Sequence, residues 1–327
     1  MKKIQLIIFL TCVMYVFASS QEIIYVRAGG NDNNSGLSET EALKTLYKAL
    51  SRAEQINSGR ITVVGTLDSN SEARNTRDSV FELSVNSDME VLITGKPDAS
   101  DSEKAILSAK GSNKSVVSVN KGNIRFEYIE ISNANGEGTG EVGVFVFSRI
   151  TLGQGAVVRD NNGFGILISG NDAICTIDGG EVRNNNSTGV FLNKGLFVLK
   201  NGTIADNKAK LAAGVFVATD TKFEMQGGTI LNNIADTGAG VIVESDAKFE
   251  MLDGTISNNT ADTGAAVVIF KKGIFEMSGG IITKNRATDI IGGVWVHPGG
   301  KFIQSRKAKV SGNTAKRTKW NPNVYRQ

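Results

Sequence analysis

The feature that most constrains this chain is a strict repeat in its second half. Phenylalanines recur there at a constant step, and only the last step is one residue longer; they are Phe197, Phe223, Phe249, Phe275 and Phe302. A glycine follows the same step, and the glycine series extends backwards at slightly shorter spacings; its members are Gly155, Gly180, Gly202, Gly228, Gly254 and Gly280. Such regularity predicts a stack of similar units in place of one irregular core.

A second pattern repeats in step with the first. Seven successive units place a small residue before an apolar-x-apolar triplet, as in "TGVFLN", "AGVFVA", "AGVIVE" and "GGVWVH". This alternation predicts short strands, and no unit contains a helical pattern of ten residues. A coil of parallel strands with one repeat per turn therefore fits the sequence best.

In such a coil, equivalent residues lie about 4.8 Å apart on neighbouring turns. The five phenylalanines should form an internal stack, with Cys175 in the same column as a buried thiol. A second inner wall is predicted at Val144, Ile166, Val190, Val215, Val241, Val267 and Val294.

Asparagines align at one corner of the predicted coil. They are Asn185, Asn207, Asn233, Asn259, Asn285 and Asn313, with Asp160 expected to start the series. Stacked amides can hydrogen-bond to one another and satisfy the backbone of the bend, so we interpret them as scaffold.

These repeats resemble the right-handed parallel β-helix of the pectate-lyase-like superfamily, and the "GGTI…NN" pattern is similar to that of exported bacterial β-helix proteins. The resemblance covers residues 120–315 strongly and 60–120 loosely. It implies an all-β fold, a single-stranded right-handed parallel β-helix (solenoid) with an N-terminal α-helical cap.

The N-terminal segment differs from the repeats. After a strand and a polar loop, we predict a helix from about Glu39 to Ile56, with Ser38 and Glu41 spaced as a capping box. This helix would cover the open end of the solenoid. The predicted division is a signal peptide at 1–20, strand and helix at 21–58, β-helix at 59–315 and a basic tail at 316–327.

The first twenty residues predict export. Lys2 and Lys3 precede an apolar run over residues 4–17, and small residues follow it. An uncleaved anchor and a lipid anchor on Cys12 are the alternatives. We expect a secreted, cell-surface or periplasmic protein with no membrane span after cleavage, and Cys175 as its one remaining cysteine.

Charge is unevenly distributed along the sequence. Residues 301–327 hold eight Lys and Arg and no acid, and the leader holds two lysines. The net charge of the whole chain is +3, so residues 21–300 carry a net charge of about −7. A basic end on an acidic body could contact an anionic glycan, a lipid head group or another partner, or could be a solvated tail.

The resemblance implies a catalytic groove with clustered carboxylates, Ca²⁺ and an Arg or Lys base in the lyases, or a carboxylate pair in the hydrolases. The repeats vary too little in length to wall a groove, and the one histidine, His297, has no acid near it in sequence. Arg159, Asp160 and Arg183 are interpreted as a surface ion pair on neighbouring turns. We therefore predict no catalytic residue, no metal site and no cofactor, with Ca²⁺ only under the lyase alternative. The irregular loops at 66–79, 95–103 and 132–141 are where a catalytic site could still lie.

Two columns should face outward. The first is an apolar stripe, predicted to bind a ligand: Phe145, Leu167, Phe191, Phe216, Ile242, Val268 and Trp295. Its alternative interpretation is ordinary strand pairing under a covering loop. The second column, Glu224, Glu250 and Glu276, lies beside Lys222 and Lys248 and is interpreted as an ion-pair network.

The function predicted from these features is a non-catalytic exported module that binds a glycan or a host or matrix protein, or that serves a structural role. The alternative is a polysaccharide lyase or glycoside hydrolase acting on an acidic polysaccharide. We expect a monomer that does not bind nucleic acid.

Overall fold

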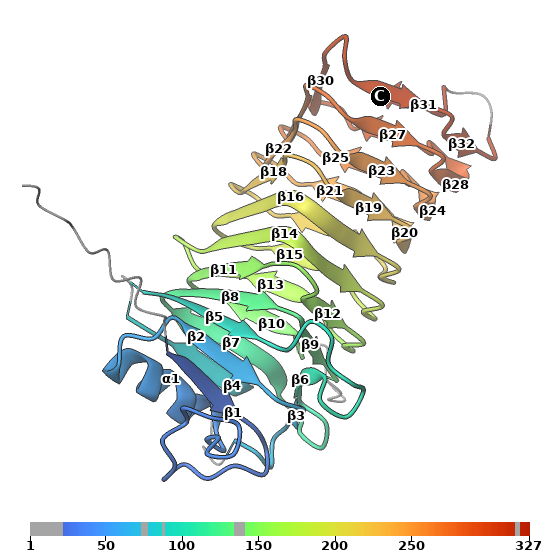
Figure 1. The fold of residues 1–327 in the computed structure, drawn as a ribbon. Coiled ribbons are helices and arrows are strands. Elements are labelled where there is room, and N and C mark those ends of the chain that lie inside the picture. The colour runs from blue at the N-terminus through green and yellow to red at the C-terminus, as the bar shows by residue number, and fades with distance from the viewer. Residues whose placement is uncertain (1–21, 73–77, 87–88, 134–140, 318–320) are drawn as a thin grey trace, which may run out of the picture.

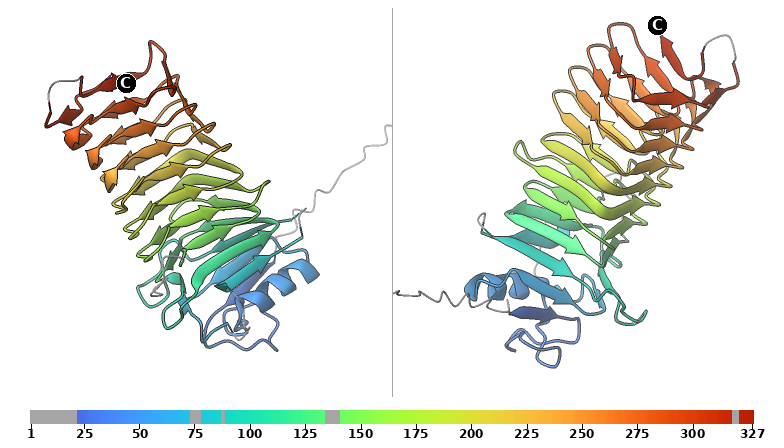
Figure 2. Two further views of the ribbon diagram at one scale, coloured as in Figure 1. Left: turned by 180° about the vertical axis from the view of Figure 1, so that it is seen from behind. Right: turned by 45° about the horizontal axis from the view of Figure 1, so that its top comes forward.

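The computed structural model describes residues 22–72, 78–86, 89–133, 141–317 and 321–327. The chain forms a right-handed parallel β-solenoid in which rungs stack along one axis (Figure 1). Figure 2 shows the same stack from two further directions, with the single described helix at the N-terminal end. The predicted signal peptide, residues 1–20, lies outside the described residues.

Two series of strands form one 19-stranded sheet, because β14 (Ile174–Arg183) and β16 (Leu196–Ala205) run through both. The first series also contains β1 (Ile23–Val26), β2 (Arg60–Val63), β5 (Glu90–Thr94), β8 (Asn123–Glu127), β11 (Arg149–Leu152), β18 (Lys222–Met225), β22 (Lys248–Met251), β26 (Ile274–Met277) and β30 (Lys301–Gln304). The second contains β3 (Thr66–Leu67), β6 (Ala105–Ser108), β9 (Ile129–Ser132), β12 (Val157–Arg159), β19 (Thr229–Leu231), β23 (Thr255–Ser257), β27 (Ile281–Thr283) and β31 (Lys309–Ser311).

A ten-stranded sheet closes the other side of the solenoid. Its strands are β4 (Ser79–Ser84), β7 (Ser115–Lys121), β10 (Val144–Val146), β13 (Ile166–Ile168), β15 (Val190–Leu192), β17 (Val215–Val217), β21 (Val241–Val243), β25 (Val267–Ile269), β29 (Val294–Val296) and β33 (Val324–Arg326). The predicted inner wall is confirmed, since its seven residues pair in register and none has any exposed surface.

The predicted phenylalanine stack is also confirmed. Successive ring centroids from Phe197 to Phe302 are 4.8, 4.6, 4.4 and 5.0 Å apart, with interplanar angles of 4° to 20°. Cys175 pairs with Phe197 in the same column and is fully buried. Burial raises the pKa of its thiol, so it stays protonated and contributes packing alone.

The asparagine ladder begins one residue later than predicted, at Asn161. Each ladder amide donates to the next amide oxygen along the axis, from Asn161 through Asn313 to Asn323, at distances of 2.8 to 3.1 Å. Asp160 is instead the preceding residue, whose φ of 54° turns the chain. Asn, Asp or Lys fills this left-handed position before most of the ladder, and Asn and Asp tolerate it better than most residues. The "NN" pairs of the sequence thus combine a turn residue with a ladder residue.

The N-terminal helix is shorter than predicted. Helix α1 spans Leu46–Gln55, and its N-cap is Thr45, whose hydroxyl accepts from the backbone of Lys48. The Ser38 hydroxyl does accept from the Glu41 backbone at 3.2 Å, but this closes only a local turn. The chain stays non-helical up to Thr45, with turns and bends, a bridge from Leu43 to Val26, and the Asp32 carboxylate accepting two backbone N–H groups just before α1.

A third, four-stranded sheet appears only in later rungs. Its strands are β20 (Ile234–Thr237), β24 (Thr260–Thr263), β28 (Arg286–Ile290) and β32 (Thr314–Ala315). They lie in the corner between the asparagine ladder and the ten-stranded sheet. The next strand of the ten-stranded sheet begins five residues after Asn161 and Asn185, and eight residues after Asn207, Asn233 and Asn259. The longer corners therefore have room for an extra strand.

Both predicted boundaries of the solenoid need correction. Strand β1 pairs with β2, so stacking begins before residue 59. At the other end, β33 pairs with β29 within the segment predicted to be a basic tail. The last described rung is therefore complete, with strands in all three sheets.

Candidate functional site

The predicted apolar stripe lies in one column on the outer face of the ten-stranded sheet. Its seven residues pair strand to strand in the predicted order, from Phe145 to Trp295, and Tyr325 extends the column by one rung. The register follows from the inner wall, because successive side chains on a strand point to opposite faces.

The column is not exposed along its whole length, and for two members the alternative interpretation, strand pairing under a cover, describes the structure. Ile242 and Val268 have no exposed surface and form a small cluster with Ala212. The longer corners cover them: a Cβ built on Gly238 would lie 2.3 Å from Ile242, and one on Gly264 would lie 2.3 Å from Val268. The backbone of the corner thus packs directly on these side chains.

The N-terminal half of the same face lacks such a cover. The outward side chains there keep partial exposure, which reaches 45% at Phe147. Leu167 and Phe191 follow the short corners after Asn161 and Asn185, and Phe216, which follows the longer corner after Asn207, is also partly exposed. We call this surface the open aromatic face; it consists of Phe145, Phe147, Phe164, Leu167, Phe191 and Phe216. Phe147 and Phe164 were missing from the prediction, although Phe147 continues the alternation of β10 and Phe164 lies in a short corner.

Ring geometry determines which part of each side chain a ligand can reach. Phe191 stacks on Phe216 with centroids 4.7 Å apart and planes at 7°, and Phe164 packs on Phe191 at 4.9 Å. Phe145 and Phe147 stack at 5.9 Å and 12°. Each of these contacts covers one face of each of the two stacked rings.

A second aromatic group lies further along the sheet. Trp295 is 4.0 Å from His297 and His297 is 4.8 Å from Phe270, measured between ring centroids. The indole Nε1 and the imidazole Nε2 are buried atoms with no hydrogen-bond partner. Burial lowers the pKa of His297, so this ring is neutral at physiological pH.

The glutamate column forms the ion-pair network that the sequence indicates. Lys222 contacts Glu224 at 2.7 Å and Glu250 at 2.8 Å. Lys248 contacts Glu250 at 2.6 Å and Glu276 at 3.0 Å, one rung further along. Hydrogen bonds from the two lysines lower the pKa of Glu250. Two lysines therefore alternate with three glutamates, and each carboxylate has at least one lysine partner.

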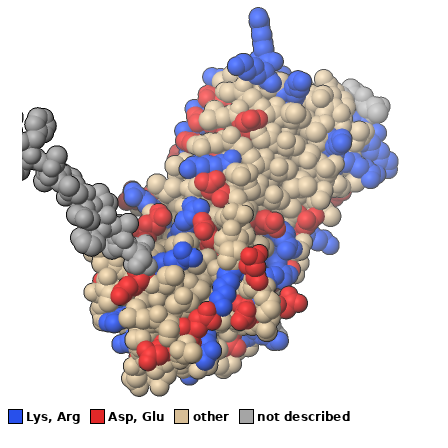
Figure 3. Space-filling model, viewed as in Figure 1, with Lys and Arg blue, Asp and Glu red and all other residues tan. Residues whose placement is uncertain are grey.

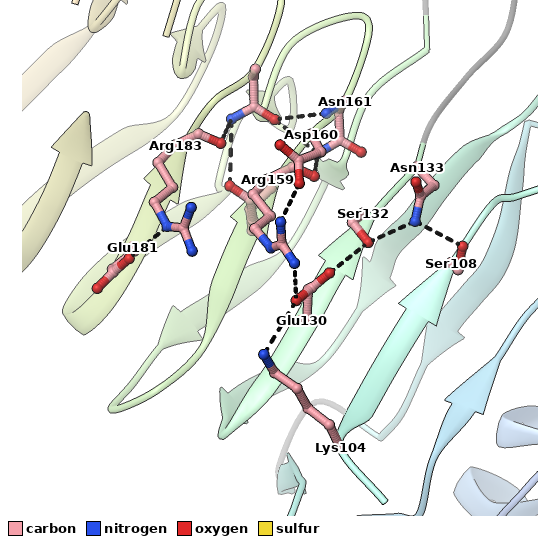
Figure 4. A network of polar contacts seen from close by, with 12 residues as sticks. Lys104, Ser108, Glu130, Ser132, Asn133, Arg159, Asp160, Asn161, Glu181 and Arg183 are labelled. Atoms are coloured by element: carbon pink, nitrogen blue, oxygen red, sulfur yellow. Dashed lines mark hydrogen bonds and ion pairs between the residues drawn. The ribbon is translucent and has the colours of Figure 1, made fainter. Parts of the chain in front are cut away.

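A polar network lies on the outer face of β9, β12 and β14 (Figure 4). Arg159 and Arg183 occupy neighbouring strands, as the sequence predicts, and Arg159 forms an ion pair with Asp160. Sequence reasoning missed Glu130, which is 7% exposed and lies 2.8 Å from the Arg159 guanidinium. No local pattern reveals this partner, since it lies 29 residues earlier on the neighbouring rung.

Beside this network is a cleft of about 310 Å³, one wall of which is the loop from Lys96 to Lys104. Glu130 in this cleft also accepts from the Ser132 hydroxyl at 3.0 Å and lies 3.8 Å from Lys104. The Arg159 guanidinium therefore lies between the carboxylates of Glu130 and Asp160, and the three side chains form an ion-pair network. Within the described ranges, no three His, Cys, Asp or Glu residues gather as metal ligands. The predicted loops at 66–79 and 132–141 lie partly outside those ranges.

The stacked rungs, the internal ladders and the parallel pairing define the chain as a parallel β-solenoid repeat protein. It belongs to the right-handed β-helix family: residues 148–315, just over half of the chain, match the family model described as "right handed beta helix region". This agrees with the resemblance to the pectate-lyase-like superfamily. Searches of curated proteins and of solved structures returned no match.

The described residues contain one helix, α1, which is ten residues long. In the described part of the chain, no helix has the length and apolar character that crossing a membrane requires.

Proposed function

We propose that this chain is a non-catalytic binding module and that the open aromatic face is its binding surface. One observation carries the proposal: five phenylalanines and a leucine stay partly exposed together on one outward surface, whereas the equivalent Ile242 and Val268 are buried under the corners beside them. Contiguous apolar surface of this kind typically marks an interaction site.

A protein is the partner that this surface suits best. Sugars bind aromatic residues through the ring faces, and here pairwise ring contacts cover part of those faces. Ring edges and the Leu167 side chain instead offer a ridged apolar surface, against which aliphatic and aromatic side chains of a protein can pack. Of the two ligand classes expected from the sequence, the geometry therefore favours protein over glycan.

We further propose that the module works outside the cytoplasm, at the cell envelope or in the medium. Support comes from the leader-like composition of residues 1–20 and from the presence of a single cysteine after it. Cys175 is buried, so it is protected from external oxidants.

The binding test uses residues 21–327, arrayed against a panel of extracellular matrix proteins and a panel of glycans. The test variant replaces Phe145, Phe191 and Phe216 together by Ser. A matched control replaces three apolar residues of 51–53% exposure that lie outside this face, namely Leu211, Ile234 and Leu252. We expect the parent chain and the control to bind the same matrix proteins and the test variant to lose at least about tenfold in affinity.

Unchanged binding of the test variant to every ligand of the parent would contradict the proposal. Binding only to glycans, with no protein ligand, would contradict the choice of partner.

The lyase or hydrolase alternative has its own support in the cleft lined by Glu130, where Lys96, Lys104 and Arg183 are cations that could hold an acidic sugar. Incubation with uronic-acid polymers, with and without Ca²⁺, tests it. Unsaturated products that absorb in the ultraviolet would establish a lyase, and new reducing ends would establish a hydrolase.

A further inference from the structure

The last described rung differs in charge from the rungs that precede it. On the first strand series, the column of Lys222 and Lys248 continues through Ile274 to Lys301. The neighbouring column of glutamates ends at Glu276, and Ile303 takes the next position. The alternating lattice of cations and anions therefore stops, and the last rung carries cations without the carboxylates that would balance them.

Further cations surround this rung. Arg306 and Lys307 lie in the turn after β30, Lys309 lies on β31, and Lys316 follows β32. Together with Lys301, these five residues are exposed and form no ion pair with any acid of the described residues. Arg317 is the exception in this segment, because it contacts Asp289 at 2.6 Å. Figure 3 shows Lys and Arg side chains gathered at this end of the rod.

Even inward positions become polar at this rung. Gln304 occupies the column of Met251 and Met277, and Arg326 occupies the column of Val296. The Arg326 guanidinium lies 5.6 Å from the centre of the Phe302 ring, over the end of the phenylalanine stack. The end of the core thus presents a positive charge as well.

The distribution of these cations favours one shape of anionic partner. They come from different sides of the solenoid: the first strand series, the second, the corner and the ten-stranded sheet. A single linear polyanion could contact only one of these sides. A flat surface that meets the end of the rod could contact all of them at once.

We propose that the last rung, through Lys301, Arg306, Lys307, Lys309 and Lys316, docks the rod end-on to an anionic lipid surface. Basic residues near such a surface are attracted to it electrostatically, and salt screens this attraction. Ile303, which is 43% exposed, would add apolar contact with the head-group layer. This site is separate from the open aromatic face, so a docked rod keeps that face available along its side.

The experiment measures co-sedimentation of residues 21–327 with vesicles of phosphatidylcholine alone or with about one-third phosphatidylglycerol. The end variant replaces Lys301, Arg306, Lys307 and Lys309 by Gln. The matched control replaces four exposed lysines from the middle of the rod that also lack an ion pair with the described acids: Lys194, Lys200, Lys208 and Lys210. Melting curves establish that both variants fold.

We expect the parent chain to bind the anionic vesicles at least about tenfold better than neutral ones, and the end variant to lose at least about tenfold. The control should change less than about twofold, and 0.5 M salt should release the parent. Equal losses in both variants, or equal binding to both kinds of vesicle, would overturn the proposal. Tighter binding to soluble polygalacturonate than to vesicles, abolished in the end variant, would overturn it in favour of a linear polymer.

Discussion

Two regions of this solenoid share one scaffold and differ in a single corner. Rungs at Asn161 and Asn185 reach the ten-stranded sheet in five residues, and the rungs from Asn207 to Asn259 take eight. Both keep the amide ladder and the inner wall. Only the longer corners add the four-stranded sheet, and the fully buried outward residues, Ile242 and Val268, both follow such corners. Phe216 and Trp295 also follow longer corners but stay partly exposed, so a longer corner covers the middle of the column and leaves its flanks open.

The largest expected effect comes from comparing equivalent positions across this divide. Ile242→Ser removes a fully buried side chain and places a hydroxyl under the corner, so we expect a loss of about 4 kcal/mol in unfolding free energy. Phe191→Ser, in the same column of the open region, should cost about 1 kcal/mol or less. Urea unfolding measures both, and equal losses would remove the distinction between the regions.

The amide ladder should respond alike in both regions. The Asn233 side-chain oxygen accepts from the backbone and the amide of Asn207, at 3.1 and 3.0 Å. Asn233→Ala would leave these buried donors unpaired, and we expect a loss of about 3 kcal/mol. Asn185→Ala, in a rung with a short corner, should cost a similar amount by the same denaturation assay. A difference between the two losses that exceeds the net contribution of one hydrogen bond, about 1.5 kcal/mol, would show that the corners alter the ladder as well.

A smaller effect is expected at the covering corner. Gly264 has a φ of 62°, and an added Cβ would meet Val268 at 2.3 Å, so Gly264→Ala should destabilise the fold by about 2 kcal/mol. Ala212 occupies the equivalent position one rung before Gly238, with a φ of 46°. Ala212→Gly should therefore be neutral or slightly stabilising. Thermal melting compares the two, and tolerance of Gly264→Ala would show that the corner packs loosely.

The smallest effect is expected in the ion-pair lattice. Lys248→Gln should cost less than about 1 kcal/mol, because these side chains are partly solvated, and 0.5 M salt should reduce the difference. Since the folded pKa of Glu250 is lowered, its contribution is present above the unfolded pKa and is lost on acidification, between about pH 5 and pH 3. The variant should lose less stability over that range than the parent. A larger acid loss in the variant would contradict this assignment.

The sequence predicts the repeated parts of the fold well. Phe223 and Val241 lie in their predicted inner columns because stacking repeats side-chain positions at fixed steps. The helix was predicted too early, because the Asp32 carboxylate binds the backbone N–H groups of Lys44 and Thr45, and a contact across twelve residues leaves no local pattern.

The burial of Ile242 and Val268 was missed for a related reason. Strand alternation gives the direction of a side chain but not the path of the corner beside it. The signal was present in the spacing of the ladder, because Asn233 follows Asn207 by 26 residues, whereas Asn207 follows Asn185 by only 22 residues. The ion pair of Glu130 with Arg159 had no such signal in the sequence, because Glu130 lies on a rung outside the regular repeats.

Hydroxyl-radical footprinting of residues 21–327, read by mass spectrometry, tests most directly whether the open aromatic face is accessible in solution. The experiment compares phenylalanines of the open aromatic face with phenylalanines of the core, so both groups have the same intrinsic reactivity with the radical. We predict oxidation of Phe145, Phe147, Phe164, Phe191 and Phe216, and protection of the core phenylalanines from Phe197 to Phe275. Protection of the first group to the level of the core would show that the face is covered in solution and would contradict the account.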